Sequence, residues 1–282
     1  MSSHTAIAAG RVAVITGGAS GIGLAAAVRF AGLGLKVAIA DVDAARLDVA
    51  KADVMAAGNG DVIAVQTDVS KKDDVERLCQ RVLTAFGDIA VVMNNAGVEG
   101  GGGPFDNYAG WERVLGINLW GVINGVHVFA PVMIAQGRPG AIINTGSKQG
   151  ITTPPGDTAY NVSKAGVKVI TEGLQHTLRN TPGCAVSAHL FVPGWVHTPM
   201  TAHGRIEKPA GAWRPEQAID MLLERMGIGD FYIICPDNDV SSDLDRKRIA
   251  WAAQDITENR PPLSRWHPDY KDAFAAFLKK DG

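Results

Sequence analysis

Two residues with complementary acid–base chemistry lie four positions apart in "YNVSK", namely Tyr160 and Lys164. The surrounding segment, 159–180, has a helical pattern, and residues i and i+4 share one face of a helix. A phenol with a pKa of about 10 is a poor base at neutral pH. A neighbouring ammonium favours the phenolate, and Tyr160 could then accept a proton from a hydroxyl group. The simpler alternative for such a pair is a solvated helix face.

A second chemical feature is the glycine-rich turn "TGGASGIG", residues 16–23, which joins an apolar run to a helical pattern. Gly17, Gly21 and Gly23 have no Cβ, so a pyrophosphate could approach their backbone, where the N–H groups of a helix N-terminus attract anions. Their G-x-x-x-G-x-G spacing differs from the G-x-G-x-x-G dinucleotide fingerprint. A purely structural turn is therefore the competing interpretation.

Asp41 ends the next apolar run, 41 − 23 = 18 residues after Gly23. At about this distance, an acid in dinucleotide-binding folds accepts hydrogen bonds from the adenosine ribose. Its carboxylate would repel a 2′-phosphate, and no Lys or Arg lies in "GGAS" or directly after Asp41. The sequence therefore predicts NAD rather than NADP. The alternative role of a helix N-cap fits Asp43 better.

The elements that would position these residues alternate along the chain. We predict strands at 12–16, 36–41, 61–68, 89–97, 140–147, 184–194 and near 230, with helices at 21–34, 44–58, 71–87 and 159–180. The strands are almost wholly apolar, which indicates that both of their faces are covered. This order predicts an α/β fold with a doubly wound parallel sheet, Rossmann-like and three-layered. We expect one domain over 1–282, with a core at about 8–238 and an aromatic-rich helical tail at about 239–282.

Composition limits the classes of partner. The net charge is −2, with acids and bases interspersed, so we expect neither nucleic acid nor a membrane as partner. Segment 114–137 has no charged side chain and is long enough to span a bilayer. It contains Asn118, Asn124, His127 and Pro131, however, so a helix buried against its own protein or against another subunit is the better interpretation.

The three cysteines, Cys79, Cys184 and Cys235, are scattered, which predicts reduced thiols in a cytoplasmic protein. No Cys or His spacing suggests a metal site. The first ten residues lack the features of an export signal.

Four segments, "TGGASGIG", "NNAG" (94–97), "YNVSK" and "PGWVHTPM" (193–200), together resemble the short-chain dehydrogenase/reductase family in its Tyr-x-x-x-Lys branch. The resemblance covers about residues 10–200 and extends to the strand near 235, whereas the tail is longer than usual. It implies an NAD(H)-dependent oxidoreductase that interconverts a secondary alcohol and a ketone, with a small-molecule substrate and a homodimeric or homotetrameric assembly. A catalytically idle NAD-binding sensor or scaffold is the alternative, although it would need none of the chemical residues.

The resemblance also implies roles for individual residues. Ser147 would hold the substrate oxygen, and Asn118 would hold a water in a proton relay. Lys164 would bind the cofactor ribose and, together with the positive nicotinamide ring, lower the pKa of Tyr160. Further cofactor-binding positions that it implies are Ser20, Ile22, Asp68, Val69, Asn95, Ala96, Gly97, Pro193, Gly194, Val196 and Thr198.

The sequence departs from the family pattern around Ser147, where Gly146 precedes it and Lys148 and Gln149 follow. Either Lys148 reads a polar feature of the substrate, or, as we expect, it points into solvent. Segments 98–103 and 195–215 should form the pocket walls and a lid, using Trp195, His197, Met200, His203 and Trp213. Pro154, Pro155, Trp251, Trp266 and Tyr270 could narrow the pocket, although packing is the commoner role of tail aromatics. We expect a bulky, mainly apolar or aromatic substrate.

Overall fold

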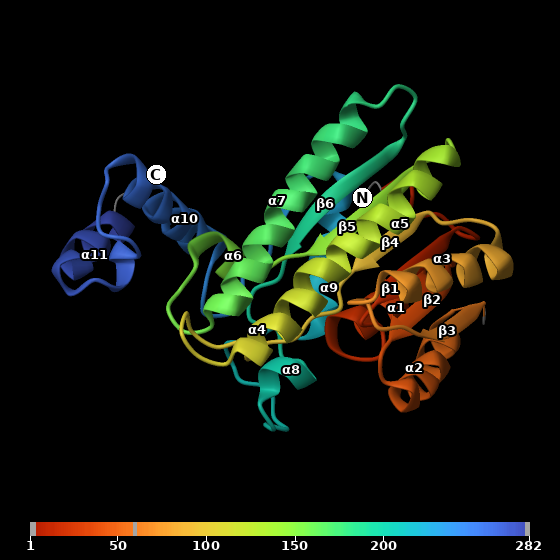
Figure 1. The fold of residues 1–282 in the computed structure, drawn as a ribbon, viewed down its shortest axis with the longest axis horizontal. Helices are drawn as coiled ribbons and strands as arrows, with labels where there is room; N and C mark the ends of the chain where they lie inside the picture. Colours follow the sequence, from red (N-terminus) through yellow and green to blue (C-terminus); the bar gives the residue numbers. More distant parts are fainter. Residues whose placement is uncertain (1–3, 59–60, 280–282) are drawn as a thin grey trace.

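The computed structural model describes residues 4–58 and 61–279 and contains a seven-stranded sheet (Figure 1). Its strands are β1 (Val12–Thr16), β2 (Lys36–Asp41), β3 (Val62–Gln66), β4 (Val91–Asn94), β5 (Gly140–Thr145), β6 (Val186–Val192) and β7 (Tyr232–Ile234). All neighbours are parallel, in the order β3-β2-β1-β4-β5-β6-β7. The order reverses between β1 and β4, so the predicted doubly wound sheet is confirmed.

Helices cover both faces of this sheet. α1 (Gly21–Gly32), α2 (Ala44–Ala57) and α9 (Pro215–Gly227) pack on one face, and α3 (Lys72–Phe86), α5 (Gly121–Ala135) and α7 (Thr158–Asn180) on the other. Successive strand residues serve the two layers: Ile15 belongs to the first apolar cluster and Val14 to the second, both fully buried. Burying one such side chain stabilises the fold by about 1.5–3 kcal/mol. Two-sided burial is why the strands are apolar throughout.

The uncharged segment forms one continuous helical rod. α4 (Tyr108–Val114) passes through a π-helical turn, η1 (Leu115–Trp120), into α5. Within the described part of the chain, Tyr108–Ala135 is the one helix long and apolar enough to cross a membrane, yet half of its most apolar window is buried inside the protein. This burial fits the prediction of a helix packed against protein. The π turn holds Asn118, and such turns are frequent at functional sites.

The C-terminal segment forms a small helical unit at one end of the molecule (Figure 1). α10 (Ser242–Thr257) is followed by two 3₁₀ turns, Ser264–Trp266 and Pro268–Tyr270, and by α11 (Lys271–Lys279). The Trp251 ring lies 5.2 Å from the rings of both Phe274 and Phe277, and the Arg260 guanidinium lies 4.0 Å from its centroid. Trp251 therefore packs within the tail, which is the role that we expected to be the commoner one for tail aromatics.

Candidate active site

A cavity of about 1250 Å³ opens along the carboxyl ends of the strands. Its wall contains most of the residues predicted from the sequence: Gly17, Ser20, Gly21, Ile22, Asp41, Asp68, Val69, Asn95, Ala96, Gly97, Ser147, Tyr160, Lys164, Pro193, Gly194, Val196 and Thr198. Gly23 and Asn118 lie behind this wall. Trp195 and Met200 also line it, whereas His197, His203, Trp213, Pro154, Pro155 and the tail aromatics do not.

The glycine turn is built by close backbone contacts. Gly17 has φ +64°, and a Cβ there would lie 2.8 Å from the Cα of Ala96. A Cβ on Gly23 would lie only 2.1 Å from the carbonyl oxygen of Gly17. The first turn of α1 carries no acidic side chain, so its N-terminus presents N–H groups to the cavity without a competing negative charge. Gly17 and Gly21 thus fit a phosphate cradle, and Gly23 supports it by packing.

Asp41 lies at the opposite end of the cavity from the tyrosine–lysine pair. Its carboxylate accepts hydrogen bonds from the backbone N–H groups of Ala19 (3.2 Å) and Asp43 (3.3 Å). Asp43 is the N-cap of α2 and accepts from the N–H of Arg46, as predicted. The Arg46 side chain also lines the cavity and pairs with Asp43 at 3.2 Å. Sequence reasoning missed Arg46 because it lies one helical turn beyond Asp43 rather than directly after Asp41.

Tyr160, Lys164 and Ser147 lie together in the cavity wall. The Lys164 Nζ is 5.7 Å from the Tyr160 ring centroid and donates to the Thr145 carbonyl at 2.8 Å. Burial lowers the pKa of Lys164 to about 8. Burial also raises the pKa of Tyr160 to about 12, a hydrogen bond with Ser147 acts in the opposite direction, and the Glu99 and Asp157 carboxylates raise it further. For the chain by itself the predicted lowering of the Tyr160 pKa is therefore not seen, because desolvation of the phenolate outweighs the hydrogen bond with Ser147.

Asn118 acts on the loop that follows β4. Its side-chain amide donates to the Val98 carbonyl at 2.8 Å and to the Ser163 hydroxyl at 3.2 Å, and its Oδ1 accepts from the Val98 N–H at 2.8 Å. A Cβ on Gly97 would lie 3.4 Å from that Oδ1 and 3.7 Å from the Lys164 Nζ. The buried Asn118 side chain thus fixes the backbone beside the lysine.

Thr16 is a site residue that the sequence analysis missed. Its hydroxyl accepts from the backbone N–H groups of Asn95 (2.9 Å) and Ala96 (3.2 Å). Asn95 in turn donates to the Thr16 carbonyl and accepts from the Thr145 hydroxyl. These bonds tie the ends of β1, β4 and β5 together beneath the cavity. No local pattern identifies Thr16, because its partners lie about 80 residues away.

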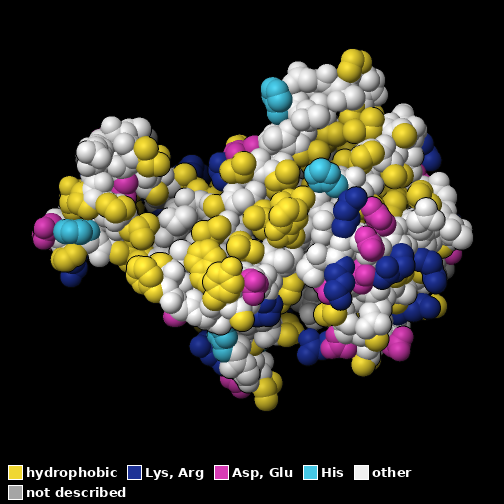
Figure 2. All heavy atoms as spheres, viewed as in Figure 1, with side chains coloured by type: hydrophobic (Ala, Val, Ile, Leu, Met, Phe, Trp, Pro, Cys, Tyr) yellow, Lys and Arg dark blue, Asp and Glu magenta, His cyan; other side chains and the backbone are white. Residues whose placement is uncertain are grey.

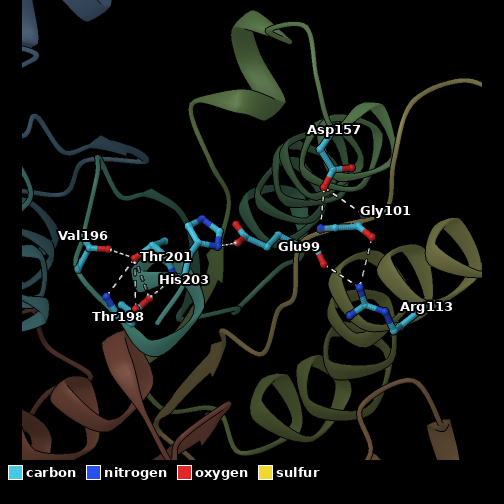
Figure 3. Close-up of polar contacts among 9 residues, drawn as sticks. Glu99, Gly101, Arg113, Asp157, Val196, Thr198, Thr201 and His203 are labelled. Atoms are coloured by element: carbon cyan, nitrogen blue, oxygen red, sulfur yellow. Dashed lines mark hydrogen bonds and ion pairs between the residues drawn. The ribbon is translucent and has the colours of Figure 1, made fainter. Parts of the chain in front are cut away.

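A cluster of polar contacts (Figure 3) includes Glu99 and Arg113, which both line the cavity. Glu99 and His203 point toward each other across the gap between the β4–α4 loop and α8 (Pro199–Ala202), with Oε1 and Nδ1 3.4 Å apart. Asp157, the N-cap of α7, accepts from the N–H groups of Gly100 and Gly101, and Arg113 donates to the Glu99 carbonyl. The predicted wall at 98–103 is therefore charged at Glu99, and His203 reaches this wall through Glu99.

Lys148 does not point into solvent, which corrects the sequence expectation. Its side chain is 21% exposed, and its Nζ lies 2.6 Å from Asp245 in α10 and 3.5 Å from Asp237 after β7. Attraction by these two carboxylates directs the Lys148 ammonium toward α10 and the loop after β7 rather than into solvent. Sequence reasoning could not pair it, since Asp245 lies in the tail, outside the segments that resemble the family.

Cys79, Cys184 and Cys235 are free thiols in the structure. Among residues 4–58 and 61–279, no group of three or more His, Cys, Asp or Glu side chains is arranged to hold a metal ion.

Comparison with known proteins agrees with this geometry. Residues 11–208 match the short chain dehydrogenase family. The chain is 36% identical over 234 residues to 1-deoxy-11-beta-hydroxypentalenate dehydrogenase of Streptomyces exfoliatus, covering 79% of this chain and 82% of that protein. The protein belongs to the short-chain dehydrogenase/reductase family. It is therefore an oxidoreductase acting on alcohol or ketone substrates, with a nicotinamide dinucleotide cofactor.

Solved structures give the same fold. A short-chain dehydrogenase/reductase from Burkholderia phymatum in complex with NAD aligns with a TM-score of 0.81 at 34% identity, covering 90% of this chain and 96% of that one. A metagenomic short-chain oxidoreductase in complex with NADP aligns with a TM-score of 0.68 at 28% identity, covering 82% and 97%. Relatives thus occur with either cofactor.

Proposed function

We propose that the protein is an NAD(H)-dependent oxidoreductase that interconverts a bulky, mainly apolar or aromatic secondary alcohol with its ketone. The observation that carries this proposal is a single cavity with a carboxylate, Asp41, at one end and the Ser147–Tyr160–Lys164 group at the other. The glycine turn, which lacks room for a Cβ at Gly17, fits a pyrophosphate between them.

The chain's own residues would divide the work as follows. In alcohol oxidation, the Tyr160 phenolate accepts the proton of the substrate hydroxyl, and in ketone reduction the phenol returns it. Ser147 donates a hydrogen bond to the substrate oxygen as its charge changes. Lys164, held by the Thr145 carbonyl, presents its ammonium beside the phenol and the ribose site. Asn118 holds the Val98 backbone and would support a proton relay toward Lys164.

When bound, NAD+ would supply the hydride acceptor and a positive charge near Tyr160. Residues placed to hold it are the turn 17–23, Asp41, the pair Asp68 and Val69, the segment 95–97, and the segment 193–198. The positive charge matters because burial, followed by the Glu99 and Asp157 carboxylates, raises the pKa of Tyr160 to about 12 in spite of the Ser147 hydrogen bond. Ionisation of the phenol is then favoured when coenzyme is bound, which restricts the base to the complex that needs it.

The preference for NAD over NADP rests on Asp41. Its carboxylate faces the cavity from the end of β2 and is fixed by two backbone N–H groups. Arg46 faces the same region but is paired with Asp43. The fixed Asp41 carboxylate would repel the 2′-phosphate of NADP. The Arg46 guanidinium would attract it only weakly, because Arg46 is already paired with Asp43.

The same proposal includes assembly into a homodimer or homotetramer in the cytoplasm. The face formed by η1 and α7 exposes Trp120 (56%), Val162 (44%) and Val169 (65%), and Figure 2 shows hydrophobic side chains gathered on this side of the molecule. Exposed apolar side chains on neighbouring helices support a packed subunit interface.

The test combines coenzyme titration with a panel of secondary alcohols of increasing bulk. We expect NAD+ to bind more tightly than NADP+, and at least one bulky apolar or aromatic alcohol to be oxidised with formation of NADH, measured at 340 nm. Tight NAD+ binding without turnover of any alcohol or ketone would instead support the sensor alternative. Preferred turnover with NADP+ would contradict the assignment of Asp41.

A further inference from the structure

Lys148, the residue directly after Ser147, connects three separate parts of the molecule. Its Nζ lies 2.6 Å from Asp245 Oδ2 in α10 and 3.5 Å from Asp237 Oδ2 in the loop Pro236–Val240. The two carboxylate side chains are only 7% and 6% exposed. Separating a buried charge from its partner is strongly unfavourable, so both acids stay paired with this ammonium. Because Lys148 directly follows Ser147, the pairing fixes where the two acids lie relative to Ser147.

Asp237 connects Lys148 to the segment 193–198. Its Oδ2 accepts from the Trp195 N–H at 3.0 Å, and its Oδ1 accepts from the N–H groups of Asp239 (3.1 Å) and Val240 (2.8 Å). Space is tight here, because a Cβ on Gly194 would lie 2.5 Å from the Pro236 carbonyl oxygen. The Pro236–Val240 loop therefore fixes the backbone of a segment that lines the cavity.

The same loop also holds the C-terminal end of the segment 195–213. Asn238 donates to the Ala210 carbonyl at 2.6 Å and accepts from the Trp213 indole N–H at 3.1 Å. A Cβ on Gly211 would lie 1.9 Å from Asp239 Oδ2. Both ends of the segment between Trp195 and Trp213 are thus attached to one loop.

Asp245 connects Lys148 to the tail. It lies in the first part of α10, whose N-cap Ser241 accepts from the Leu244 N–H, and α10 packs against α6 (Gln149–Thr152). Ile151 and Thr152 of α6 face Arg248 and Ile249 of α10 across a cavity of about 40 Å³. Tail contacts such as Trp251 with Phe274 then join α11 to the same unit.

We propose that Lys148 is a positioning residue that, through Asp237 and Asp245, sets the place of Ser147 relative to the segment 193–198 and makes helix α10 a working part of the active site. The inference rests on the proposed function for its catalytic meaning. Lys148 and Asp237 line the cavity themselves, but the Lys148 ammonium is engaged by two carboxylates, so it acts through Ser147 and Trp195 rather than on the substrate. The tail thereby contributes to catalysis without lining the cavity.

The first experiment measures amide hydrogen exchange with and without NAD+, which needs no substrate. We expect NAD+ to slow exchange in residues 16–23, in 145–152, in 193–198 and, through the Lys148 junction, in the first half of α10. In Lys148→Met and Asp245→Asn the slowing in α10 should be lost while that in 16–23 remains. Lys148→Arg should restore it, and Arg246→Met, an exposed cation beside Asp245, should behave as wild type.

Two outcomes overturn the coupling: slowing in 16–23 with none in α10 of the wild type, or undiminished slowing in α10 of Lys148→Met. If neither NAD+ nor NADP+ slows exchange in 16–23, it is the proposed function that fails. The two failures are therefore distinguishable.

The second experiment separates positioning from mere stabilisation. The double variant Lys148→Met with Asp245→Leu replaces the Lys148–Asp245 pair with apolar groups, while Asp237 keeps its three backbone N–H donors. It should unfold at a higher temperature than Lys148→Met alone, which leaves both buried carboxylates without their cation. We still expect kcat for the best alcohol to fall by about 10- to 100-fold with KM for NAD+ little changed, since small displacements of a reacting group are costly. Recovery of kcat together with stability would show a structural role only. A raised KM confined to anionic alcohols would show direct substrate contact, which also contradicts the proposal.

Discussion

At the scale of single residues, Tyr160 is the proposed proton acceptor. Replacing Tyr160 with Phe removes the hydroxyl and keeps the ring beside Lys164. We expect kcat/KM for the best alcohol to fall by about 10²- to 10⁴-fold, because a positioned acid or base contributes about that much. Coenzyme affinity, measured by fluorescence titration, should be preserved. Tyr108→Phe, at an exposed tyrosine outside the cavity, is the matched control. Undiminished oxidation by Tyr160→Phe would contradict the mechanism.

Asp41 governs the choice of coenzyme at the same scale. Asp41→Asn removes the negative charge and leaves Arg46 in the cavity wall. We expect weaker binding of NAD+ and stronger binding of NADP+, so the ratio of the two dissociation constants should move toward NADP+. Adding Arg46→Met should cancel the gain for NADP+, and Asp48→Asn, on the exposed side of α2, should leave the ratio unchanged. A constant ratio in Asp41→Asn would exclude this role.

Glu99 should tune Tyr160 through its charge. Its carboxylate is one of the groups that raise the pKa of Tyr160, after burial. Glu99→Gln removes this repulsion of the phenolate, so the Tyr160 pKa falls and the acid limb of the alcohol oxidation profile moves to lower pH. The measurement is kcat against pH for Glu99→Gln, with Asp106→Asn of the same loop as control.

A variant of His203 separates the effect of the Glu99 charge from an effect of moving the predicted lid, 195–215. His203→Gln breaks the contact with Glu99 and keeps the carboxylate. Its acid limb should stay at the wild-type pH. An equal shift in Glu99→Gln and His203→Gln would assign the effect to the lid instead.

At the scale of elements, the π turn η1 aims Asn118 at the loop after β4. Asn118→Ala leaves the partly buried N–H and carbonyl of Val98 without their side-chain partner, each costing about 1 kcal/mol of unfolding free energy. We expect lower stability in urea unfolding and a lower kcat. Asn124→Ala is the matched control, since it breaks a buried bond to the Val69 carbonyl near the predicted adenine site. It should reduce stability and coenzyme affinity but preserve kcat. Equal kcat in both variants would refute a role for Asn118 at the site.

The elements themselves were largely predictable, because each depends on local sequence. β1 and β2 match their predicted bounds, because the apolar run of each strand ends at a polar residue, Thr16 in β1 and Asp41 in β2. The polar residues that follow parallel strands converge at one edge by topology alone, which brings Asp41 and Ser147 to one cavity.

Other features could not be predicted from the sequence. Some depend on contacts between distant segments, and one depends on which of several opposing effects on a pKa is the largest. The pairings of Thr16 with Asn95 and of Lys148 with Asp245 join distant segments that carry no shared pattern. The sign of the Tyr160 pKa shift required comparing burial with charge attraction, and only the fold gives the burial.

At the scale of the whole molecule, two histidines connect the N-terminal segment to strand β6. His4 contacts the Ser187 hydroxyl at 3.1 Å, and its ring lies 5.3 Å from that of His189 in β6. Burial, and then the charge of His189, lowers the pKa of His4 to about 4, and burial also lowers that of His189. The folded protein therefore binds fewer protons than the unfolded chain between about pH 6.5 and 4.

Stability should accordingly be complete above about pH 6.5 and should fall as the pH drops toward 4. For His4 we expect a loss of roughly 2 kcal/mol, reduced from the full shift because part of the ring stays in contact with water. Urea unfolding at several pH values measures this. His4→Gln should flatten the dependence, whereas His127→Gln, at an exposed position, should not. A wild-type stability that does not change over this range would contradict the prediction.

The Lys148–Asp245 ion pair has a consequence for synthesis on the ribosome. Asp245 follows Lys148 by 245 − 148 = 97 residues, which at about 5–20 residues per second takes roughly 5–20 s. Once residue 164 has been added, early in that interval, the nascent chain contains the glycine turn, the serine, the tyrosine and the lysine of the site. Its Lys148 ammonium nevertheless has no carboxylate to meet on α10. A polypeptide released before α10 emerges would thus carry every catalytic group and still lack their final alignment.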